Sequence, residues 1–284
     1  MKKFSPILTT ILLIPLLSHA QYSKSSKVDF GFFVGGAYYI GDLNNKHFDR
    51  FTKPAGGLVF RYNFNKRAAL RANFLMGTVE AYDSYSTSQW QRERNLNFKS
   101  PIKELSAQFE FNFFNYKIGG DESQNFSPYI FMGLAGFHFD PQEQTANGSV
   151  HLQPLGTEGQ GLPGGASLKK YKLTQLSLPF GVGFKTSFSK GMCIGFEWGM
   201  RKTFTDYLDD VSTTYYDPAV LTQRDPSAAI VADPSTGKDA NYSNTGKQRG
   251  NPSNKDWYSF FGIVLTLQIN ATNTCAGALK MGGG

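Results

Sequence analysis

The chain has 284 residues and a formal net charge of +7, from 29 lysines and arginines against 22 aspartates and glutamates. Its mean hydropathy of −0.34 excludes a bundle of apolar membrane helices, although the chain holds 25 phenylalanines and 14 tyrosines. The basic residues are scattered, without an arginine-rich run or a glycine-rich phosphate loop, so nothing indicates nucleic-acid binding. A basic surface of this kind suits anionic lipid head groups or an acidic protein partner.

Residues 1–20 have the three parts of a secretory signal peptide. Lys2 and Lys3 supply positive charge, residues 7–17 are apolar, and small residues precede the expected cleavage site. The apolar run is shorter than the about 20 residues that a membrane helix needs. We therefore expect a mature chain that begins at Gln21, and no lipoprotein, because no cysteine lies at the cleavage point.

Segments in which apolar and polar residues alternate follow the signal peptide. A β-strand places alternate side chains on opposite faces, so each segment has one apolar and one polar face. The alternation predicts eight strands, at about residues 28–41, 57–65, 67–81, 104–113, 129–140, 174–188, 192–207 and 257–270. Behind a secretory signal, this pattern is typical of an all-β protein, an eight-stranded antiparallel transmembrane barrel of the outer membrane.

The connections between the predicted strands alternate in length. Short turns follow the second, fourth and sixth strands, and long connections cover residues 82–98, 141–172 and 208–256. Outer-membrane barrels have short periplasmic turns and long extracellular loops. We therefore expect the barrel domain over residues 21–270, both termini in the periplasm, and a periplasmic tail over residues 271–284. Inserted soluble domains are the alternative, but the long connections lack hydrophobic periodicity.

The polar faces of the strands carry charges that would point into the barrel. Four are positive and three negative: Arg61, Arg71, Glu104, Glu110, Lys185, Glu197 and Arg201. Side chains can fill the interior of an eight-stranded barrel, and isolated charges there would be costly. We expect these seven residues to form an ion-pair network that plugs the lumen, rather than a selective ion path.

Four segments resemble one known family: residues 39–44 (YIGDLN), 152–161 (LQPLGTEGQG), 205–213 (TDYLDDVST) and 256–259 (DWYS). Together they resemble the PorG-like outer-membrane barrels of the Bacteroidetes type IX secretion and gliding motility system. The most specific segment contains Asp206, Tyr207, Asp209 and Asp210. The resemblance implies a non-enzymatic barrel that contacts the periplasmic ring of a PorK-like lipoprotein and a PorN-like protein.

Three groups of residues suggest chemistry, and none is convincing. Calcium prefers oxygen ligands, but the spacing of Asp206, Asp209 and Asp210 does not match the twelve-residue calcium loop. Loop capping, or pairing with Arg201 and Lys202, is the better interpretation. The histidines of the mature chain lack paired metal-ligand spacing. His138 with Asp140 suggests a lipid hydrolase, but no nucleophilic serine accompanies them. We therefore expect no metal, no cofactor and no catalysis.

The two cysteines leave alternatives open. Cys193 has the inward parity of Glu197, and Cys275 follows the last predicted strand. Either they form an internal disulfide, or Cys275 is free to link to a partner. The alternative function to ring anchoring is a small passive porin or a ligand-binding barrel of the OmpA/OmpX type. The expected partners are the ring proteins, outer-membrane lipid and lipopolysaccharide.

Overall fold

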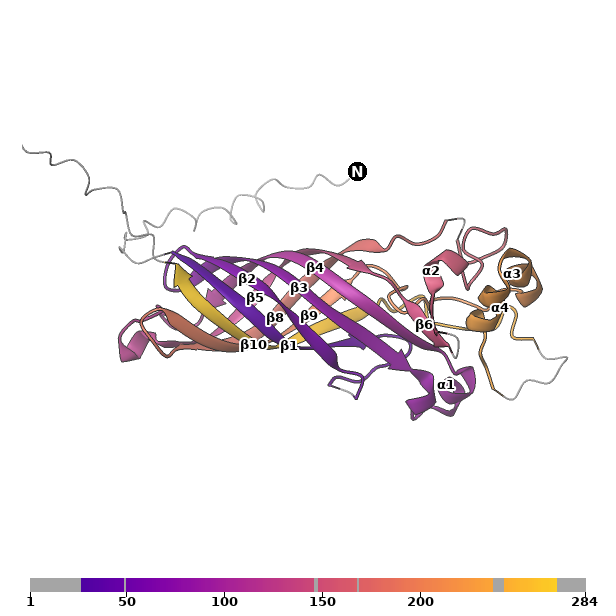
Figure 1. The fold of residues 1–284 in the computed structure, drawn as a ribbon, viewed down its shortest axis with the longest axis horizontal. Helices are drawn as coiled ribbons and strands as arrows, with labels where there is room; N and C mark the ends of the chain where they lie inside the picture. Colours follow the sequence, from indigo (N-terminus) through magenta and orange to yellow (C-terminus); the bar gives the residue numbers. More distant parts are fainter. Residues whose placement is uncertain (1–26, 49, 146–147, 168, 237–242, 270–284) are drawn as a thin grey trace, which may run out of the picture.

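The computed structural model describes residues 27–48, 50–145, 148–167, 169–236 and 243–269 (Figure 1). The predicted signal peptide over residues 1–20, Cys275 and the predicted tail over residues 271–284 lie outside the described residues. Eight strands of the described chain make the barrel: β1 (Val28–Ile40), β2 (Lys53–Asn63), β3 (Ala68–Tyr82), β4 (Asn97–Asn112), β5 (Phe126–Phe139), β8 (Thr174–Ser187), β9 (Met192–Thr203) and β10 (Trp257–Ile269).

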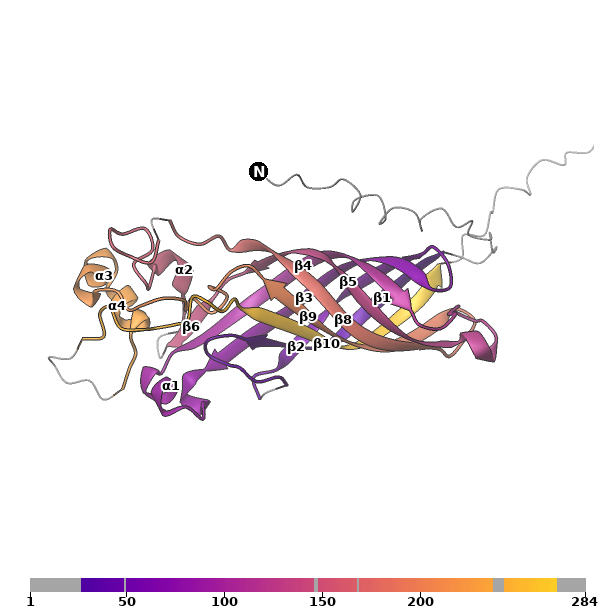
Figure 2. The ribbon, with the colours of Figure 1, turned by 180° about the vertical axis from the view of Figure 1, so that it is seen from behind.

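The barrel closes because every wall strand pairs antiparallel with two neighbours. The strand order is β3-β2-β1-β10-β9-β8-β5-β4, and β4 pairs back with β3. Paired residues followed once around the wall lead from Ile102 of β4 to Asn112 of the same strand, a shift of ten residues. Such a shift requires tilted strands, which Figures 1 and 2 show.

The outer wall is apolar along the middle of every strand. Leu105, Met132 and Leu134 are 66%, 67% and 65% exposed. A water-soluble protein rarely exposes so large a continuous apolar surface, whereas a transmembrane barrel presents it to lipid. The prediction of an eight-stranded antiparallel outer-membrane barrel is therefore confirmed.

No helix among the described residues is both long and apolar enough to cross a membrane.

The interior of the barrel is filled by side chains of two kinds. Buried aromatic rings occupy the end nearer the long loops, including Phe33, Phe137 and Tyr258. Charged side chains occupy the remainder, together with the buried rings of Tyr129 and Phe131. Glycines of the inner wall make room for them, because a Cβ on Gly199 would lie 2.7 Å from Arg201 Nη1.

The long connections fold into a compact unit at one end of the barrel, which we call the loop cap (described parts of residues 41–52, 83–96, 140–173 and 204–256; Figure 1). Its elements are η3 (Asp83–Tyr85), α1 (Gln89–Arg94), β6 (Gln142–Thr145), β7 (Gly148–His151), α2 (Leu152–Leu155), α3 (Pro218–Arg224) and α4 (Pro226–Ala232). The sequence predicted none of them, since elements of three to seven residues are too short to display a helical or a strand period. Leu152, Leu208 and Val231 extend the buried core of the barrel into the loop cap.

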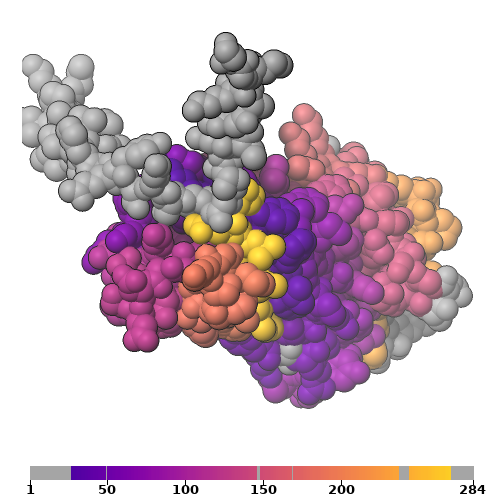
Figure 3. All heavy atoms as spheres, turned by 60° about the vertical axis from the view of Figure 1, so that its left-hand side comes forward, coloured from indigo at the N-terminus to yellow at the C-terminus, as the bar shows by residue number. Residues whose placement is uncertain are grey.

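At the opposite end of the barrel, the described residues form turns between strands, and we call it the turn end. Its largest turn contains η4 (Glu122–Gln124), and the β8–β9 turn projects beside it (Figure 3). Tyr116, Ile118 and Cys193 form a small buried cluster that closes the lumen there. Both ends of the interior are therefore covered by protein.

Candidate functional site

The lumen holds a charge cluster centred on one carboxylate, Glu110. Arg61 Nε lies 3.1 Å and Arg71 Nη1 lies 3.4 Å from Glu110 Oε2, and Lys185 Nζ contacts Glu110 Oε1. Arg71 also reaches Glu197, with Nη1 2.9 Å from Oε2. Alternation within β2, β3, β4, β8 and β9 points all five side chains inward, so the strands alone position them.

A second ion pair lies nearer the loop cap and is separate from the first cluster. Arg201 Nε is 3.0 Å from Glu104 Oε2, which also accepts a hydrogen bond of 2.9 Å from the Tyr258 hydroxyl. The Arg201 guanidinium lies 4.8 Å above the ring of Phe260. The seven predicted residues thus all point inward, but they form two groups rather than one network, because aromatic rings fill the space around Arg201.

Asp29 is a lumen charge that the sequence analysis missed. It is 1% exposed, lies 3.8 Å from Arg61 Nη1, and accepts a hydrogen bond of 2.8 Å from Asn63 Nδ2. Asp29 lies four positions before Phe33 in β1, so strand alternation places both side chains on the inward face. This alternation could have identified Asp29 from the sequence. With Asp29, the described lumen residues carry four cations and four carboxylates. All eight are 0–3% exposed, so the interior is neutral and closed to solvent.

The loop cap holds a second polar centre, built on the segment 205–213. Asp209 Oδ2 accepts a hydrogen bond of 2.5 Å from the hydroxyl of Tyr39, at the end of β1. The same hydroxyl lies 3.0 Å from Asp256 Oδ1, and Asp256 Oδ2 accepts from the backbone N–H of Leu208 at 2.9 Å. One hydroxyl proton cannot serve two carboxylates, so one of the two aspartates holds its own proton. These bonds tie the segment to the loop-cap ends of β1 and β10, two neighbouring strands of the barrel.

Asp210 and Asp206 stabilise the loops of the cap. Asp210 accepts hydrogen bonds from Thr157 Oγ1 at 2.5 Å and from the Tyr171 hydroxyl at 2.6 Å. Asp206 accepts from Ser212 Oγ at 2.7 Å. Asp210 has a φ of 65°, a left-handed backbone that aspartate tolerates better than most residues. These aspartates thus cap loops, as the sequence suggested.

The cation that pairs with this segment is Arg249, not the expected Arg201 or Lys202. Arg249 Nη1 donates to the backbone carbonyl of Asp210 at 2.6 Å and lies 3.0 Å from Glu158 Oε1. Arg201 is held by Glu104, and Lys202 lies over the ring of Trp257. Pairing with Arg201 or Lys202 was therefore wrong, because both side chains belong to the barrel wall.

Glu158, like Arg249, is a residue of the loop cap that the sequence analysis missed. Its carboxylate accepts from the backbone N–H groups of Ser212 and Thr213, from Thr213 Oγ1 at 2.7 Å, and from Arg249. Tyr207 contributes its ring, which stacks on Tyr171 with centroids 4.7 Å apart. Glu158 lies within the segment 152–161 of the resemblance, and that was the only signal for it.

Buried carboxyl groups outnumber cations in the loop cap. Among its described residues, seven carboxyls are buried but only two guanidiniums: Asp83, Glu143, Glu158, Asp206, Asp209, Asp210 and Asp256 against Arg94 and Arg249. Burial raises the pKa of Asp206 and of Asp210 to about 6 and that of Glu143 to about 7. Burial and mutual repulsion raise the pKa values of Asp209 and Asp256 well above the ordinary range. Carboxyl groups of the cap therefore stay protonated at pH values where an ordinary carboxyl group is ionised.

The remaining candidates give no catalytic arrangement. His138 Nδ1 lies 3.1 Å from Thr174 Oγ1, whereas Asp140 pairs with His151 at 2.8 Å. No group of three or more potential metal ligands occurs in the described part of the chain. Cys193 is buried as a free thiol, and its pairing with Cys275 lies outside the described residues.

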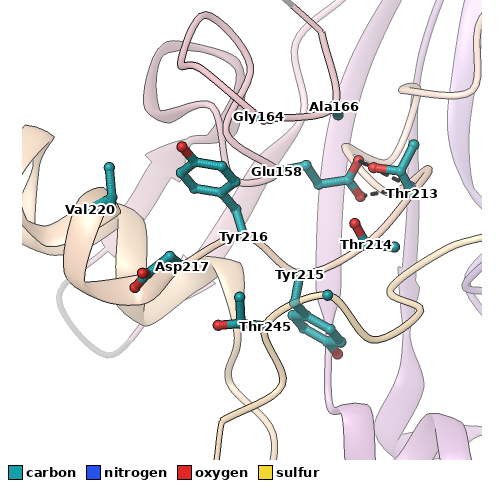
Figure 4. Close-up of a pocket in the computed structure, with 12 residues that line it drawn as sticks. Glu158, Gly164, Ala166, Thr213, Thr214, Tyr215, Tyr216, Asp217, Val220 and Thr245 are labelled. Atoms are coloured by element: carbon teal, nitrogen blue, oxygen red, sulfur yellow. Dashed lines mark hydrogen bonds between the residues drawn. The ribbon is translucent and has the colours of Figure 1, made fainter.

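A pocket of about 370 Å³ opens on the surface of the loop cap (Figure 4). Tyr216, Asp217 and Val220 line one side, and Glu158 and Thr213 line the other. The Tyr216 hydroxyl donates to the Pro163 carbonyl at 2.7 Å, which fixes the ring at the edge of the pocket. Aromatic rings, hydroxyls and the carboxylates of Glu158 and Asp217 suit a small polar ligand.

A closed barrel with an apolar outer wall, an ion-paired lumen and a folded loop cap defines an integral outer-membrane β-barrel protein. The chain belongs to the family described as "Domain of unknown function (DUF6089)", whose model matches residues 6–154. No curated protein matches the sequence.

Solved outer-membrane barrels are distantly similar to the chain. Neisserial surface protein A is 8% identical, with 87% of this chain and 100% of that chain covered and a TM-score of 0.42. OprG of Pseudomonas aeruginosa is 10% identical, with 86% and 98% covered and a TM-score of 0.39. Ail of Yersinia pestis is 9% identical, with 87% and 99% covered and a TM-score of 0.37.

Proposed function

We propose that this chain is a non-enzymatic barrel subunit of a type IX secretion system, and that it positions the periplasmic ring of a PorK-like lipoprotein and a PorN-like protein at the outer membrane. The four resembling segments support the family, and the closed lumen is the observation that carries the role. Because eight buried charges neutralise one another inside the barrel, the molecule acts through its surfaces rather than through a pore.

The proposal orients the barrel with the turn end in the periplasm and the loop cap outside. Short periplasmic turns and long external loops are the rule for such barrels. In this orientation β1 begins and β10 ends on the periplasmic side, as the expected periplasmic termini require.

The turn end is the surface offered to the ring. Lys66, Arg67 and Lys190 are exposed there and Lys117 is half-buried, while two exposed acids, Asp121 and Glu122, lie in the largest turn. A basic rim speeds the encounter with an acidic partner more than it raises final affinity. We therefore propose an acidic contact surface on the ring proteins.

Co-purification from native membranes tests the anchoring role. We expect Lys66→Glu with Lys190→Glu to lose the ring proteins while the barrel still inserts, and deletion of residues 271–284 to do the same. A Cys275→Ser variant separates a covalent link from contact by the rest of the tail. Lys169→Glu with Lys172→Glu, in the loop cap, is the matched control. Undiminished co-purification of the ring proteins in every turn-end and tail variant would refute the proposal.

The porin alternative makes a different prediction for planar bilayers. A lumen closed by paired charges should give no stable conductance steps, because a continuous water column has no room. Openings of nanosiemens size from the wild-type barrel would favour the porin and reject the plug.

Ligand binding outside the cell is a second candidate, favoured by the pocket beside Tyr216. Its ring, the neighbouring threonine hydroxyls and Asp217 resemble the groups that hold sugars in protein sites. Saturation-transfer NMR with neutral mono- and disaccharides would test it, and Tyr216→Ala should abolish any signal. No signal from the wild-type protein would remove this candidate.

A further inference from the structure

Two lysines of β4 lie on the lipid-facing side of the barrel wall. Lys99 and Lys103 are both exposed, and Leu105, Ala107 and Phe109 follow them on the same face of the strand. We call them the β4 lysine pair. They therefore lie where the apolar wall meets the loop cap, at one edge of the membrane-spanning band.

The surroundings of Lys103 are those of a membrane boundary. Its register partners are Met76 on β3, which is 46% exposed, and His138 on β5. Leu105, two residues along the strand, is 66% exposed. A lysine at such a boundary extends its ammonium group toward the head groups while its methylene chain contacts apolar surface.

Nearby carboxylates are engaged by other cations. Glu80, the register partner of Lys99, pairs with Lys53 at 2.8 Å. Asp140, two residues from His138, pairs with His151 at 2.8 Å. Within the described part of the chain, neither lysine of the pair has a carboxylate within ion-pair distance. Both ammonium groups are therefore available to anionic head groups at the edge of the bilayer.

The groups beside the lysine pair can also recognise a sugar. The His138 ring and the Thr174 hydroxyl are bonded to each other at 3.1 Å and are exposed, and Gln142 is the register partner of Lys99. One site therefore combines an apolar wall for acyl chains, two ammonium groups for phosphates, and hydroxyl, imidazole and amide groups for a sugar. That combination matches a phosphorylated glycolipid better than a phospholipid or free phosphate.

We propose that the β4 lysine pair binds the phosphate groups of lipopolysaccharide in the outer leaflet. The proposal rests on the orientation given under the proposed function, in which the loop cap lies outside the cell. It does not depend on the type IX role, because it concerns the barrel wall alone. Clusters of basic residues at a membrane surface are an established way to recognise anionic head groups.

The test measures binding of lipopolysaccharide to the purified full-length barrel in phosphatidylethanolamine nanodiscs. Lys99→Gln with Lys103→Gln should weaken binding about 30-fold, since each lysine near an anionic surface contributes about 1 kcal/mol and 1.4 kcal/mol is tenfold. Lys99→Arg with Lys103→Arg should retain binding because the charge remains. Lys66→Gln with Lys190→Gln removes the same charge at the turn end and should change nothing.

Two further binding measurements identify the ligand. Lipopolysaccharide stripped of its phosphates should bind as weakly as the glutamine variant binds the intact glycolipid. Phosphatidylglycerol should bind the wild type more weakly than lipopolysaccharide does. The proposal is overturned if the folded glutamine variant binds lipopolysaccharide as the wild type does, or if phosphatidylglycerol competes equally. Circular dichroism establishes that each variant is folded.

Discussion

The lumen and the loop cap solve the problem of buried charge in opposite ways. The described lumen residues balance four cations with four carboxylates, whereas seven buried carboxyls of the loop cap face only two guanidiniums. In the lumen every charge has a partner of opposite sign close by, so no proton is needed. In the cap, hydroxyls, backbone N–H groups and bound protons replace the missing cations. The stability of the cap should therefore depend on pH.

Removal of the central carboxylate of the lumen should have the largest effect. Glu110→Ala leaves Arg61, Arg71 and Lys185 close together without their shared anion. Breaking one partner of a buried ion pair costs about 3–5 kcal/mol. We expect that loss in the free energy of unfolding, measured by urea titration in lipid vesicles.

A second substitution shows whether charge is the cause. Lys185→Met in the Glu110→Ala background removes one uncompensated cation, so it should restore part of the lost stability. A Glu110→Ala variant that loses less than about 1 kcal/mol would mean that water reaches the lumen.

A charge placed on the outer wall should destabilise the barrel about as much as the loss of a charge from the lumen does. Phe109 is 46% exposed on the lipid side, in the middle of the apolar face of β4. Phe109→Arg should cost about 2–4 kcal/mol in vesicles, because an arginine near the midplane of the bilayer is poorly solvated. Phe109→Leu is the apolar control and should lose much less. Equal stability of the two variants would place residue 109 outside the bilayer.

The sequence predicts the residues of the lumen more completely than it predicts those of the loop cap. Alternation within single strands was enough to point Arg61, Glu110 and Glu197 inward, because the period of two is a local property. The cap depends on contacts between distant segments, such as Glu158 with Arg249. No local period reports such contacts. The segment 205–213 could therefore be noted as unusual, but its partners could not be assigned.

Stability of the loop cap should fall as pH rises. The native pKa of Asp210 is about 6, whereas an unfolded aspartate titrates near about 3.9. Between these values the native state binds more protons than the unfolded state, so alkalinisation favours unfolding. The loss should be about 2–3 kcal/mol for this group, complete above the native pKa.

Hydrogen exchange of the loop cap at pH 5 and pH 8 would measure about half of that loss, about 1.4 kcal/mol, because the remainder occurs below pH 5. After correction for the intrinsic exchange rate, which itself rises with pH, residues 205–213 should be less protected at the higher pH, while β4 and β9 remain equally protected. Asp210→Asn cannot ionise, so it should reduce the pH dependence by the share of this one group. A pH-independent cap, or a barrel that loosens together with it, would remove the contrast between the two regions.

Removal of the Tyr171 hydroxyl should have the smallest effect. It tests whether the pH dependence of the cap involves one particular hydrogen bond. Tyr171→Phe removes the bond of 2.6 Å to Asp210 but keeps the ring stacked on Tyr207. A neutral hydrogen bond is worth about 1 kcal/mol, and one to a charged group about 1.5–3 kcal/mol. The variant should therefore lose about 1 kcal/mol at pH 5, where Asp210 is protonated, and more at pH 8. An equal loss at both values would show that Asp210 keeps one protonation state throughout, and that other carboxyls of the cap carry its pH dependence.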